Sequence, residues 1–421
     1  MNGKKKIIYL HIGFHKTATT SIQETLKQNR SYLATIGDGY FYSEELGCNH
    51  GPFFVSVFGD EKQLLIMHRR HKRTDEEITK FIENQKEAVK KELENVKCGN
   101  VIFSAEAVSD LGKESCIDIK HYLESALSDY QIKIIVCVRN AVNWTSSNIQ
   151  QDVKRGIYTI DGTHDIQINS TNRFESRLQK FIDIYGAENI IIYKFEDSVK
   201  HEYGPVGYFL NQIGVNDDYV QKFRIINSNE GISYNALKLI SYINGRYPIL
   251  INNLVPDGRN NLDLLPLHFI PGGGKYKMSF ESAEILMKNS IEDTKWLKDN
   301  FEIDYASMKT PDNKPNKCEY GKEFFIKGLE IIHESTDVIK YLSYSFFEQE
   351  YNSVSDGNSR NILKKLLKTM KRKYSYIDFD GTLESVVAVQ EKRETETRDI
   401  KKITKLVYHG IKRRVTSFLK K

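Results

Sequence analysis

Short apolar segments that alternate with helical ones in the first half of the chain constrain its fold more than any other feature. The clearest, residues 132–138, reads Ile-Lys-Ile-Ile-Val-Cys-Val, and comparable runs lie at 5–11, 100–104 and 189–195. Helical segments accompany them at 20–29, 76–97, 117–127 and 174–185. Strands that are apolar throughout are typical of parallel sheets buried on both faces, and alternation with helices is typical of α/β folds. The sequence therefore predicts a three-layer α/β sandwich in which helices flank a central parallel sheet.

The length of the chain, 421 residues, exceeds what one small hydrophobic core supports. After residue 203 the pattern becomes helical and looped, and a stretch rich in Pro, Asn and Lys at 310–317 is typical of a linker. We expect an α/β domain at 1–308, a linker with a helical extension at 309–358, and a basic amphipathic helical tail at 359–421. No run of about 18 apolar residues occurs, so no membrane-spanning helix is expected.

The basic charge of the chain is concentrated in this tail. Residues 360–421 contain 18 basic and 7 acidic residues, a balance of +11, although the whole chain carries only +5. The preceding part is acidic on balance, which argues against a nucleic-acid-binding core. Apolar residues recur with nearly helical spacing at 403, 406, 407, 411, 415, 418 and 419. Such a helix is predicted to lie on an anionic membrane surface or to bind an acidic polymer, and the alternative is a solvated helix that docks on the body.

The cysteines and the N-terminus bear on the compartment. The five cysteines never form a Cys-x-x-Cys pair, so the sequence predicts neither a disulfide framework nor a zinc site. The apolar run at 7–10 is too short for the core of a signal peptide. These features favour a reducing environment and a cytoplasmic location.

A first candidate site follows the strand predicted at 5–11. The string His11-Ile12-Gly13-Phe14-His15-Lys16-Thr17-Ala18-Thr19-Thr20-Ser21 leads from this strand into a helix. Ligands of open α/β sheets bind where strands end, and a helix N-terminus there directs backbone N–H groups at an anion. Lys16 adds a cation and the hydroxyl groups add donors, so the pattern predicts a phosphate cradle. It is not a Walker A loop, because His15 precedes the lysine where glycine is required. The alternative is a helix N-cap, for which Thr19 or Thr20 would serve.

A second candidate site follows the strand at 132–138. Arg139 leaves the end of this strand, and Ser147 lies one to two turns into the next helix. An arginine fork and a serine hydroxyl can together hold a second phosphate. The alternative is an ordinary strand end with helix-capping Asn and Thr residues.

Together the two motifs resemble those of sulfotransferases that use 3′-phosphoadenosine 5′-phosphosulfate (PAPS), especially bacterial members that act on carbohydrates. In that family a segment reading roughly Lys-Thr-Gly-Thr-Thr-Ser binds the 5′-phosphosulfate, and Arg at a later strand end, with Ser eight residues on, binds the 3′-phosphate. Residues 16–21 and the Arg139–Ser147 pair match in order and spacing. The resemblance covers about residues 5–305 and implies a P-loop-like fold, PAPS as donor and no metal. It assigns donor binding to Lys16, Thr17, Ala18, Thr19, Thr20, Ser21, Arg139 and Ser147.

Two departures from the family pattern stand out. Ala18 replaces the usual glycine, which restricts the loop if this residue needs a positive φ. Asn140-Ala141 replaces a common Asp/Asn-Pro, and we expect little effect from that change.

The resemblance also suggests catalytic roles. Lys16 is placed to meet the charge that develops on the bridging oxygen of the donor. The acceptor hydroxyl needs a general base. Glu106, just past the strand at 100–104, corresponds to a glutamate that serves as the base in related glycan sulfotransferases. His15 is the second candidate, because imidazole suits proton transfer near neutral pH. The alternative for Glu106 is a carboxylate that caps a helix or pairs with a lysine.

The leading hypothesis is a PAPS-dependent transferase whose acceptor is a carbohydrate, and the tail is expected to bring it to lipid-linked glycan at the inner membrane surface. One rival is a kinase or ATPase that uses the same loop, which needs a Mg²⁺-binding carboxylate after a strand. The other rival is a non-catalytic protein that binds glycan or membrane through the tail and the basic patch at 68–73. For this patch, a solvated helix face is the simpler explanation. The Asp378-Phe379-Asp380 string mimics a phosphatase nucleophile motif, and we interpret it as coincidence because only 41 residues follow.

Overall fold

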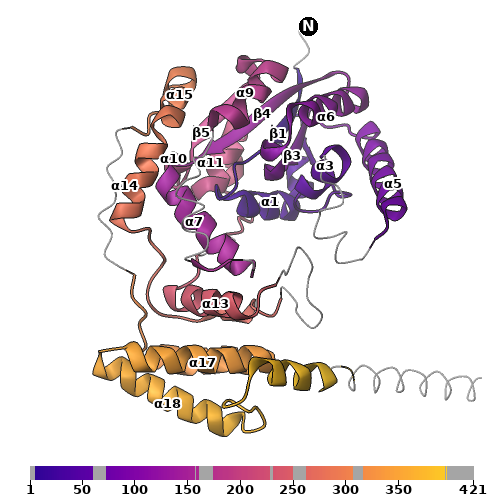
Figure 1. The fold of residues 1–421 in the computed structure, drawn as a ribbon. Coiled ribbons are helices and arrows are strands. Elements are labelled where there is room, and N and C mark those ends of the chain that lie inside the picture. The colour runs from indigo at the N-terminus through magenta and orange to yellow at the C-terminus, as the bar shows by residue number, and fades with distance from the viewer. Residues whose placement is uncertain are drawn as a thin grey trace, which may run out of the picture. The chain divides into compact units, whose positions relative to one another are not determined.

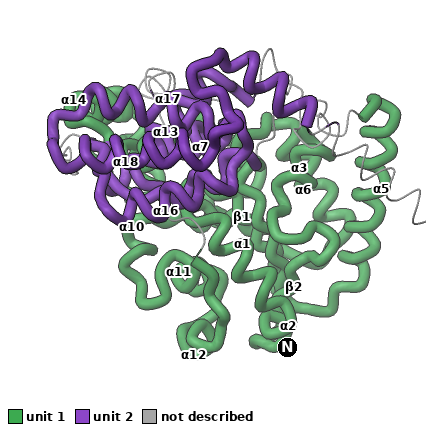
Figure 2. The backbone as a smooth tube through the Cα atoms, turned by 90° about the horizontal axis from the view of Figure 1, so that it is seen from below, with its two compact units in different colours: residues 1–148, 165–230, 278–313 green, residues 149–164, 231–277, 314–421 purple. Residues whose placement is uncertain are grey.

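The computed structural model describes residues 5–59, 73–156, 158–160, 174–227, 231–249, 262–306, 316–393 and 395. The chain forms two compact units (Figure 2). Unit 1 comprises Met1–Asn148, Asp165–Glu230 and Met278–Asn313, and unit 2 comprises Ile149–His164, Gly231–Lys277 and Lys314–Lys421. The domain boundaries expected from the sequence stay a prediction. In the described part of the chain, no helix combines the length and the apolar character needed to cross a bilayer.

Unit 1 is built on a sheet of five parallel strands in the order β2-β3-β1-β4-β5 (Figure 1). The strands are β1 (Lys6–His11), β2 (Tyr40–Tyr42), β3 (Asn100–Ser104), β4 (Tyr130–Val138) and β5 (Ile190–Lys194). The central strand β1 pairs with β3 and β4, so that Ile8 lies between Val101 and Ile132. Because all strands are parallel, their carboxyl ends lie along one edge of the sheet.

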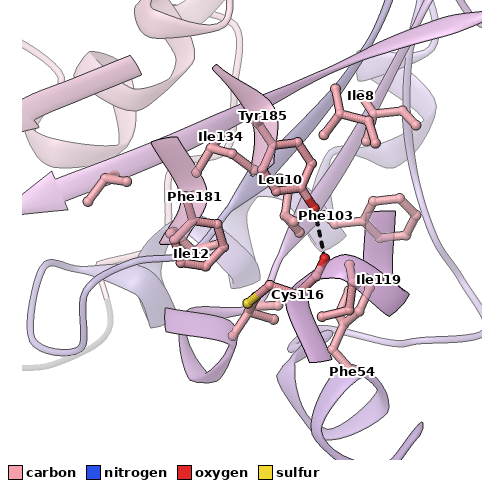
Figure 3. Close-up of a cluster of buried hydrophobic side chains, with 14 of the residues drawn as sticks. Ile8, Leu10, Ile12, Phe54, Phe103, Cys116, Ile119, Ile134, Phe181 and Tyr185 are labelled. Atoms are coloured by element: carbon pink, nitrogen blue, oxygen red, sulfur yellow. Dashed lines mark hydrogen bonds between the residues drawn. The ribbon is translucent and has the colours of Figure 1, made fainter. Parts of the chain in front are cut away.

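Helices cover both faces of this sheet. On one face, Ile8 and Leu10 of β1 belong to a buried cluster with side chains of α3, α5, α6, α9 and α15 (Figure 3). On the other face, Tyr9 belongs to a second cluster with side chains of α1, α2, α11 and α12. The bounds are α1 (Thr19–Gln28), α2 (Arg30–Leu33), α3 (Gly51–Phe58), α5 (Asp75–Glu94), α6 (Lys113–Ala126), α9 (Phe174–Tyr185), α11 (Gly204–Gln212), α12 (Asp217–Val220) and α15 (Ile291–Phe301). This arrangement is compatible with a three-layer sandwich.

The α/β class and the central parallel sheet predicted from the sequence are confirmed. The four predicted strands correspond to β1, β3, β4 and β5, and the helix predicted at 174–185 is α9. The edge strand β2 was not expected, because its three residues, Tyr-Phe-Tyr, are too few to show a periodic pattern. The start of α5 follows from its sequence: Thr74 and Glu77 form a capping box, in which each side chain accepts a hydrogen bond from the backbone N–H of the other.

Unit 2 contains helices α13 (Tyr234–Arg246), α16 (Lys322–His333), α17 (Asp337–Ser353) and α18 (Gly357–Lys373). Helix α17 packs against α13, α16 and α18. The helical character predicted for 320–351 is present in α16 and α17. The amphipathic stripe predicted at 403–419 lies outside the described residues.

Two histidines buried in unit 1 predict a loss of stability in acid. Burial lowers the pKa of His11 and of His50 to about 3, and both are neutral in the folded protein at neutral pH. In the unfolded chain a histidine has a pKa of about 6.5, so the unfolded state binds protons first as the pH falls. Stability is therefore complete above pH ~6.5 and is lost towards pH ~3, with about 2 kcal/mol lost per histidine at pH ~5.

Urea unfolding near pH 7.5 and near pH 5 measures this loss. The His50 ring stacks on Tyr42 at 4.3 Å, and neither of its ring nitrogens has a hydrogen-bond partner among the described residues. His50→Phe keeps the aromatic packing and removes the titrating group, so the variant should lose about 2 kcal/mol less than the wild type between the two pH values. Identical pH dependence in the two proteins would contradict this account of His50.

Candidate active site at the strand ends

The two predicted motifs follow neighbouring strands, β1 and β4. The chain leaves β1 towards β2 and leaves β4 towards β5, so the two connections run in opposite directions. Open α/β sheets bind their ligands at such a point. The pairing of the two segments continues past the end of β1, because Ile12 N donates to Ile135 O (3.0 Å) and Phe14 N donates to Cys137 O (2.9 Å). The loop at 12–18 and the segment after Val138 therefore lie side by side.

Gly13 brings the first loop against Glu106. Its φ is +85°, and a Cβ atom there would lie 2.8 Å from the Cβ of Glu106. Only glycine satisfies both demands without displacing the neighbouring backbone. The close approach places the loop after β1 beside the segment after β3.

The loop leads into α1 without a side-chain cap. The N-cap of α1 is Ala18, and Thr19 and Thr20 lie in the first turn, so neither serves as the N-cap. The alternative explanation of the hydroxyl cluster as a helix cap by Thr19 or Thr20 is therefore wrong. The hydroxyl of Thr17 donates a hydrogen bond to Phe14 O, so its hydrogen is already engaged within the loop. Thr19 and Ser21 are buried, whereas Thr20 is exposed.

Two non-glycine residues of this loop adopt the left-handed region. Lys16 has φ 66° and Ala18 has φ 63°. The condition under which Ala18 would restrict the loop is therefore met. An L-residue pays about 1–2 kcal/mol in this region, so the conformation is held by its surroundings.

Ala18→Gly is expected to raise the free energy of unfolding by up to about 1 kcal/mol, because glycine removes the left-handed penalty although it loses more chain entropy on folding. Urea unfolding measures the change. Ala34 is exposed and has φ −64°, which any residue adopts, and Ala34→Gly should instead destabilise the protein by about 0.5–1 kcal/mol. Equal destabilisation by both substitutions would contradict strain at Ala18.

Arg139 connects the second motif with the first. Its Nη1 donates to the carbonyl oxygen of Lys16 at 2.7 Å, and its guanidinium lies 4.5 Å from the centre of the Phe195 ring. Burial lowers the pKa of Arg139, and the nearby carboxylate of Glu196 opposes that shift. Ser147 lies half-buried in α7 (Ala141–Lys154), and its hydroxyl makes no hydrogen bond within the described residues. Arg139 and the loop are thus brought together, while Ser147 contacts neither through a hydrogen bond.

Asn140 fixes the start of α7 and links it to the end of β5. Its Oδ1 accepts from Asn143 N at 2.9 Å, and its backbone N–H and side-chain amide both donate to Oε1 of Glu196. Glu196 lies in the first turn of α10 (Phe195–Ser198), and its Oε2 accepts a hydrogen bond of 2.9 Å from the hydroxyl of Tyr305. Burial and the Glu196 carboxylate raise the pKa of Tyr305 far above its usual range. Sequence reasoning missed Glu196 and Tyr305.

Glu106 lies in the short helix η2 (Glu106–Asp110), directly after β3. Its side chain is 13% exposed, and its Oε1 lies 4.0 Å from Nδ1 of His15. Its Oε2 accepts a hydrogen bond of 2.7 Å from Nε2 of Gln23, a buried residue of α1. The structure thus brings the two candidate bases together. Gln23 was not assigned a role from the sequence, although its position on the buried face of α1 was a signal.

The other edge of His15 faces Asp110. Nε2 of His15 lies 3.4 Å from Oδ2 of Asp110, and Oδ1 of Asp110 lies 2.8 Å from Arg177 of α9. Burial alone would raise the pKa of Asp110, but the hydrogen bond with His15 and the charge of Arg177 outweigh it and hold the pKa below the usual value. The main chain of His15 is also held, because Nε1 of Trp144 donates to its carbonyl oxygen at 3.0 Å. His15 is therefore fixed between two carboxylates.

The remaining sequence predictions fall elsewhere. Of the basic patch at 68–73, only Arg73 is described, and its guanidinium lies 4.4 Å from the centre of the Phe81 ring. The Asp378–Asp380 string forms a turn after α18, in which Asp380 pairs with Lys371 at 3.0 Å. Within the described ranges, no three His, Cys, Asp or Glu side chains gather as a metal site would require.

The strand ends thus combine a helix N-terminus, a lysine loop, an arginine and a half-buried glutamate. Such a set can bind a ligand that carries two anionic groups and can accept a proton from a hydroxyl beside it. Comparison with known proteins adds no assignment: no family model matches the chain, and no curated protein matches it.

Proposed function

We propose that the protein is a sulfotransferase that moves the sulfuryl group of PAPS to a hydroxyl of an acceptor, and that the acceptor is a carbohydrate. The observation that carries the proposal is the contact between the two anion-binding motifs, in which Arg139 donates to the carbonyl oxygen of Lys16 at 2.7 Å. PAPS carries two separate anionic groups, the 5′-phosphosulfate and the 3′-phosphate, and two adjoining motifs could bind one group each. The central position of β1, with the lysine loop at its end, is what a P-loop-like fold would have. The carbohydrate acceptor rests on the family resemblance alone.

In this proposal the loop after β1 holds the 5′-phosphosulfate. The backbone N–H groups at the start of α1 face the anion, and Lys16 supplies the positive charge. The hydroxyls of Thr19, Thr20 and Ser21 are the candidates for further hydrogen bonds, and Thr17 shapes the loop through its bond to Phe14. Arg139 and Ser147 hold the 3′-phosphate. Ser147 fits this role because its hydroxyl makes no hydrogen bond within the described chain.

Transfer requires one bond to break as another forms. The acceptor oxygen attacks the sulfur in line, the bond from sulfur to the bridging oxygen of the nucleotide breaks, and the acceptor proton passes to Glu106. Negative charge develops on the bridging oxygen, where Lys16 stabilises it. Gln23 orients Glu106 through its 2.7 Å hydrogen bond. His15 is the alternative base, because it lies beside Glu106 and is held by Asp110.

A transfer assay with sulfur-labelled PAPS tests the proposal. The full chain is incubated with labelled donor and three separate acceptors: a neutral polysaccharide, a glycolipid and a simple phenol. We expect label in one of the two glycan fractions, without added metal, and about 10²–10³-fold less label with Lys16→Ala. Label in the phenol alone would contradict the carbohydrate acceptor. Transfer of phosphate from Mg-ATP, with no transfer from PAPS, would favour the kinase and overturn the proposal.

A further inference from the structure

Helix α18 of unit 2 carries seven basic residues and no acidic one. They are Arg360, Lys364, Lys365, Lys368, Lys371, Arg372 and Lys373. All seven side chains belong to exposed residues. Their accumulation on one helix of an otherwise acidic chain calls for an explanation other than solubility.

The apolar side of α18 is already used within unit 2. Leu363, Leu366 and Met370 are fully buried. The helix packs against α16 and also against α17, which lies beside it in Figure 1. Successive residues of an α-helix are rotated by about 100° around its axis. Viewed down the axis, four basic side chains therefore share an arc of about 140° on the side opposite this stripe, in the angular order Arg360, Lys364, Lys368 and Lys365. Because the apolar stripe is packed within unit 2, the basic face of α18 is held towards the solvent. An α18 that docks through its apolar stripe cannot also insert that stripe into a membrane.

Helix stability does not account for this face. A positive charge near a helix C-terminus is favourable, which explains Lys371, Arg372 and Lys373, but the effect fades within the last turn. Lys364 and Lys368 are one turn apart, and like charges at this spacing destabilise a helix.

Within the described part of the chain, little neutralises the basic face of α18. Lys371 pairs with Asp380 at 3.0 Å, and Arg360 lies 5.3 Å from the centre of the Tyr351 ring. Among the described residues, none forms an ion pair with Lys364, Lys365, Lys368 or Arg372. These four charges are available to an external anion.

We propose that the basic face of α18 binds an anionic phospholipid surface by electrostatic attraction, with the helix remaining folded on unit 2. Three observations favour a membrane over a nucleic acid. Lysine, a hydrated point charge, predominates over arginine, which suits diffuse attraction more than bidentate recognition. Helix α18 has no aromatic side chain on which a base could stack. The sequence after residue 395 continues with basic residues and a helical apolar pattern, and a stable membrane attachment needs two such signals.

Sedimentation with lipid vesicles tests this inference. The full chain is mixed with vesicles of phosphatidylcholine, alone or with phosphatidylserine, at about 0.1 M and about 0.5 M salt. We expect binding only to the vesicles that contain phosphatidylserine, and loss of that binding at the higher salt. The triple variant Lys364→Glu, Lys365→Glu, Lys368→Glu should bind at least about 100-fold more weakly.

A matched control keeps the test specific. Lys80, Lys222 and Lys288 are exposed lysines of unit 1, and their replacement by glutamate changes the net charge equally. This control variant should retain binding, and circular dichroism should show that both triple variants keep the helical content of the wild type. Equal binding to neutral vesicles, equal loss in the control, or binding to RNA without binding to vesicles would each overturn the inference. A shortened chain that ends after residue 395 should keep the salt-sensitive part of the vesicle binding. If the shortened chain loses vesicle binding completely, the attachment belongs to residues 396–421 instead. The inference is independent of the proposed sulfotransferase activity, which the vesicle assay does not measure.

Discussion

Lys16→Met is expected to lower kcat for sulfuryl transfer by about 10³-fold and to raise the Kd for the nucleotide product by less than about tenfold. Methionine keeps the length of the side chain and removes the charge that is proposed to stabilise the leaving oxygen. Arg139 bonds to the main-chain carbonyl of Lys16, not to its side chain, so the substitution leaves that contact in place. Steady-state transfer rates from PAPS, with calorimetric binding of 3′-phosphoadenosine 5′-phosphate, separate the two effects.

The matched control for this prediction is Lys27→Met. Lys27 lies in the last turn of the same helix, α1, away from the loop, and is exposed. Its replacement should change neither kcat nor Kd. A similar loss of rate in both variants, or a full rate with Lys16→Met, would remove Lys16 from the catalytic step.

Glu106→Gln is expected to lower kcat by about 10²–10⁴-fold, because it removes the proposed general base for the acceptor hydroxyl. Glutamine is nearly isosteric, and its side-chain oxygen can still accept the hydrogen bond from Gln23. The affinity for 3′-phosphoadenosine 5′-phosphate should stay unchanged, since the proposed role of Glu106 is towards the acceptor and not the nucleotide. Transfer rates and calorimetry again report the two quantities.

Two further variants decide between the candidate bases. Glu114→Gln alters an exposed glutamate in the first turn of α6 and should have no effect on the rate. His15→Asn should cause a smaller loss than Glu106→Gln if Glu106 is the base. If His15→Asn abolishes transfer while Glu106→Gln retains it, His15 takes the role and Glu106 becomes a residue that positions it.

The sequence predicted the parts of this molecule that depend on local pattern. The apolar runs of β1, β3, β4 and β5 predicted a parallel sheet, which the structure contains. The anion site at the lysine loop stays a prediction. From the sequence, Ala18 could be said to restrict the loop only if the residue needs a positive φ. The structure shows that it does, because φ of Ala18 is 63°.

Contacts between distant segments could not be predicted in the same way. The hydrogen bond from Gln23 to Glu106 depends on how α1 packs beside the end of β3. The contact of Tyr305 with Glu196 joins residues 109 positions apart in the sequence. The need for glycine at position 13 arises from the Cβ of Glu106, which no local pattern reveals. Such pairs follow from tertiary packing, and a single sequence carries no periodic signal for them.

The most direct test of the donor site is calorimetric binding of 3′-phosphoadenosine 5′-phosphate without metal, compared with Mg-ATP and with adenosine 5′-phosphate. The wild type should bind the bisphosphate with micromolar affinity and more tightly than either competitor. The hydroxyl of Ser147 makes no hydrogen bond within the described chain, so Ser147→Ala should leave stability unchanged. The substitution should weaken binding of the bisphosphate about tenfold. Binding of adenosine 5′-phosphate, which lacks the 3′-phosphate, should be unaffected. A preference for Mg-ATP, or an equal effect of Ser147→Ala on both adenosine nucleotides, would contradict the PAPS site.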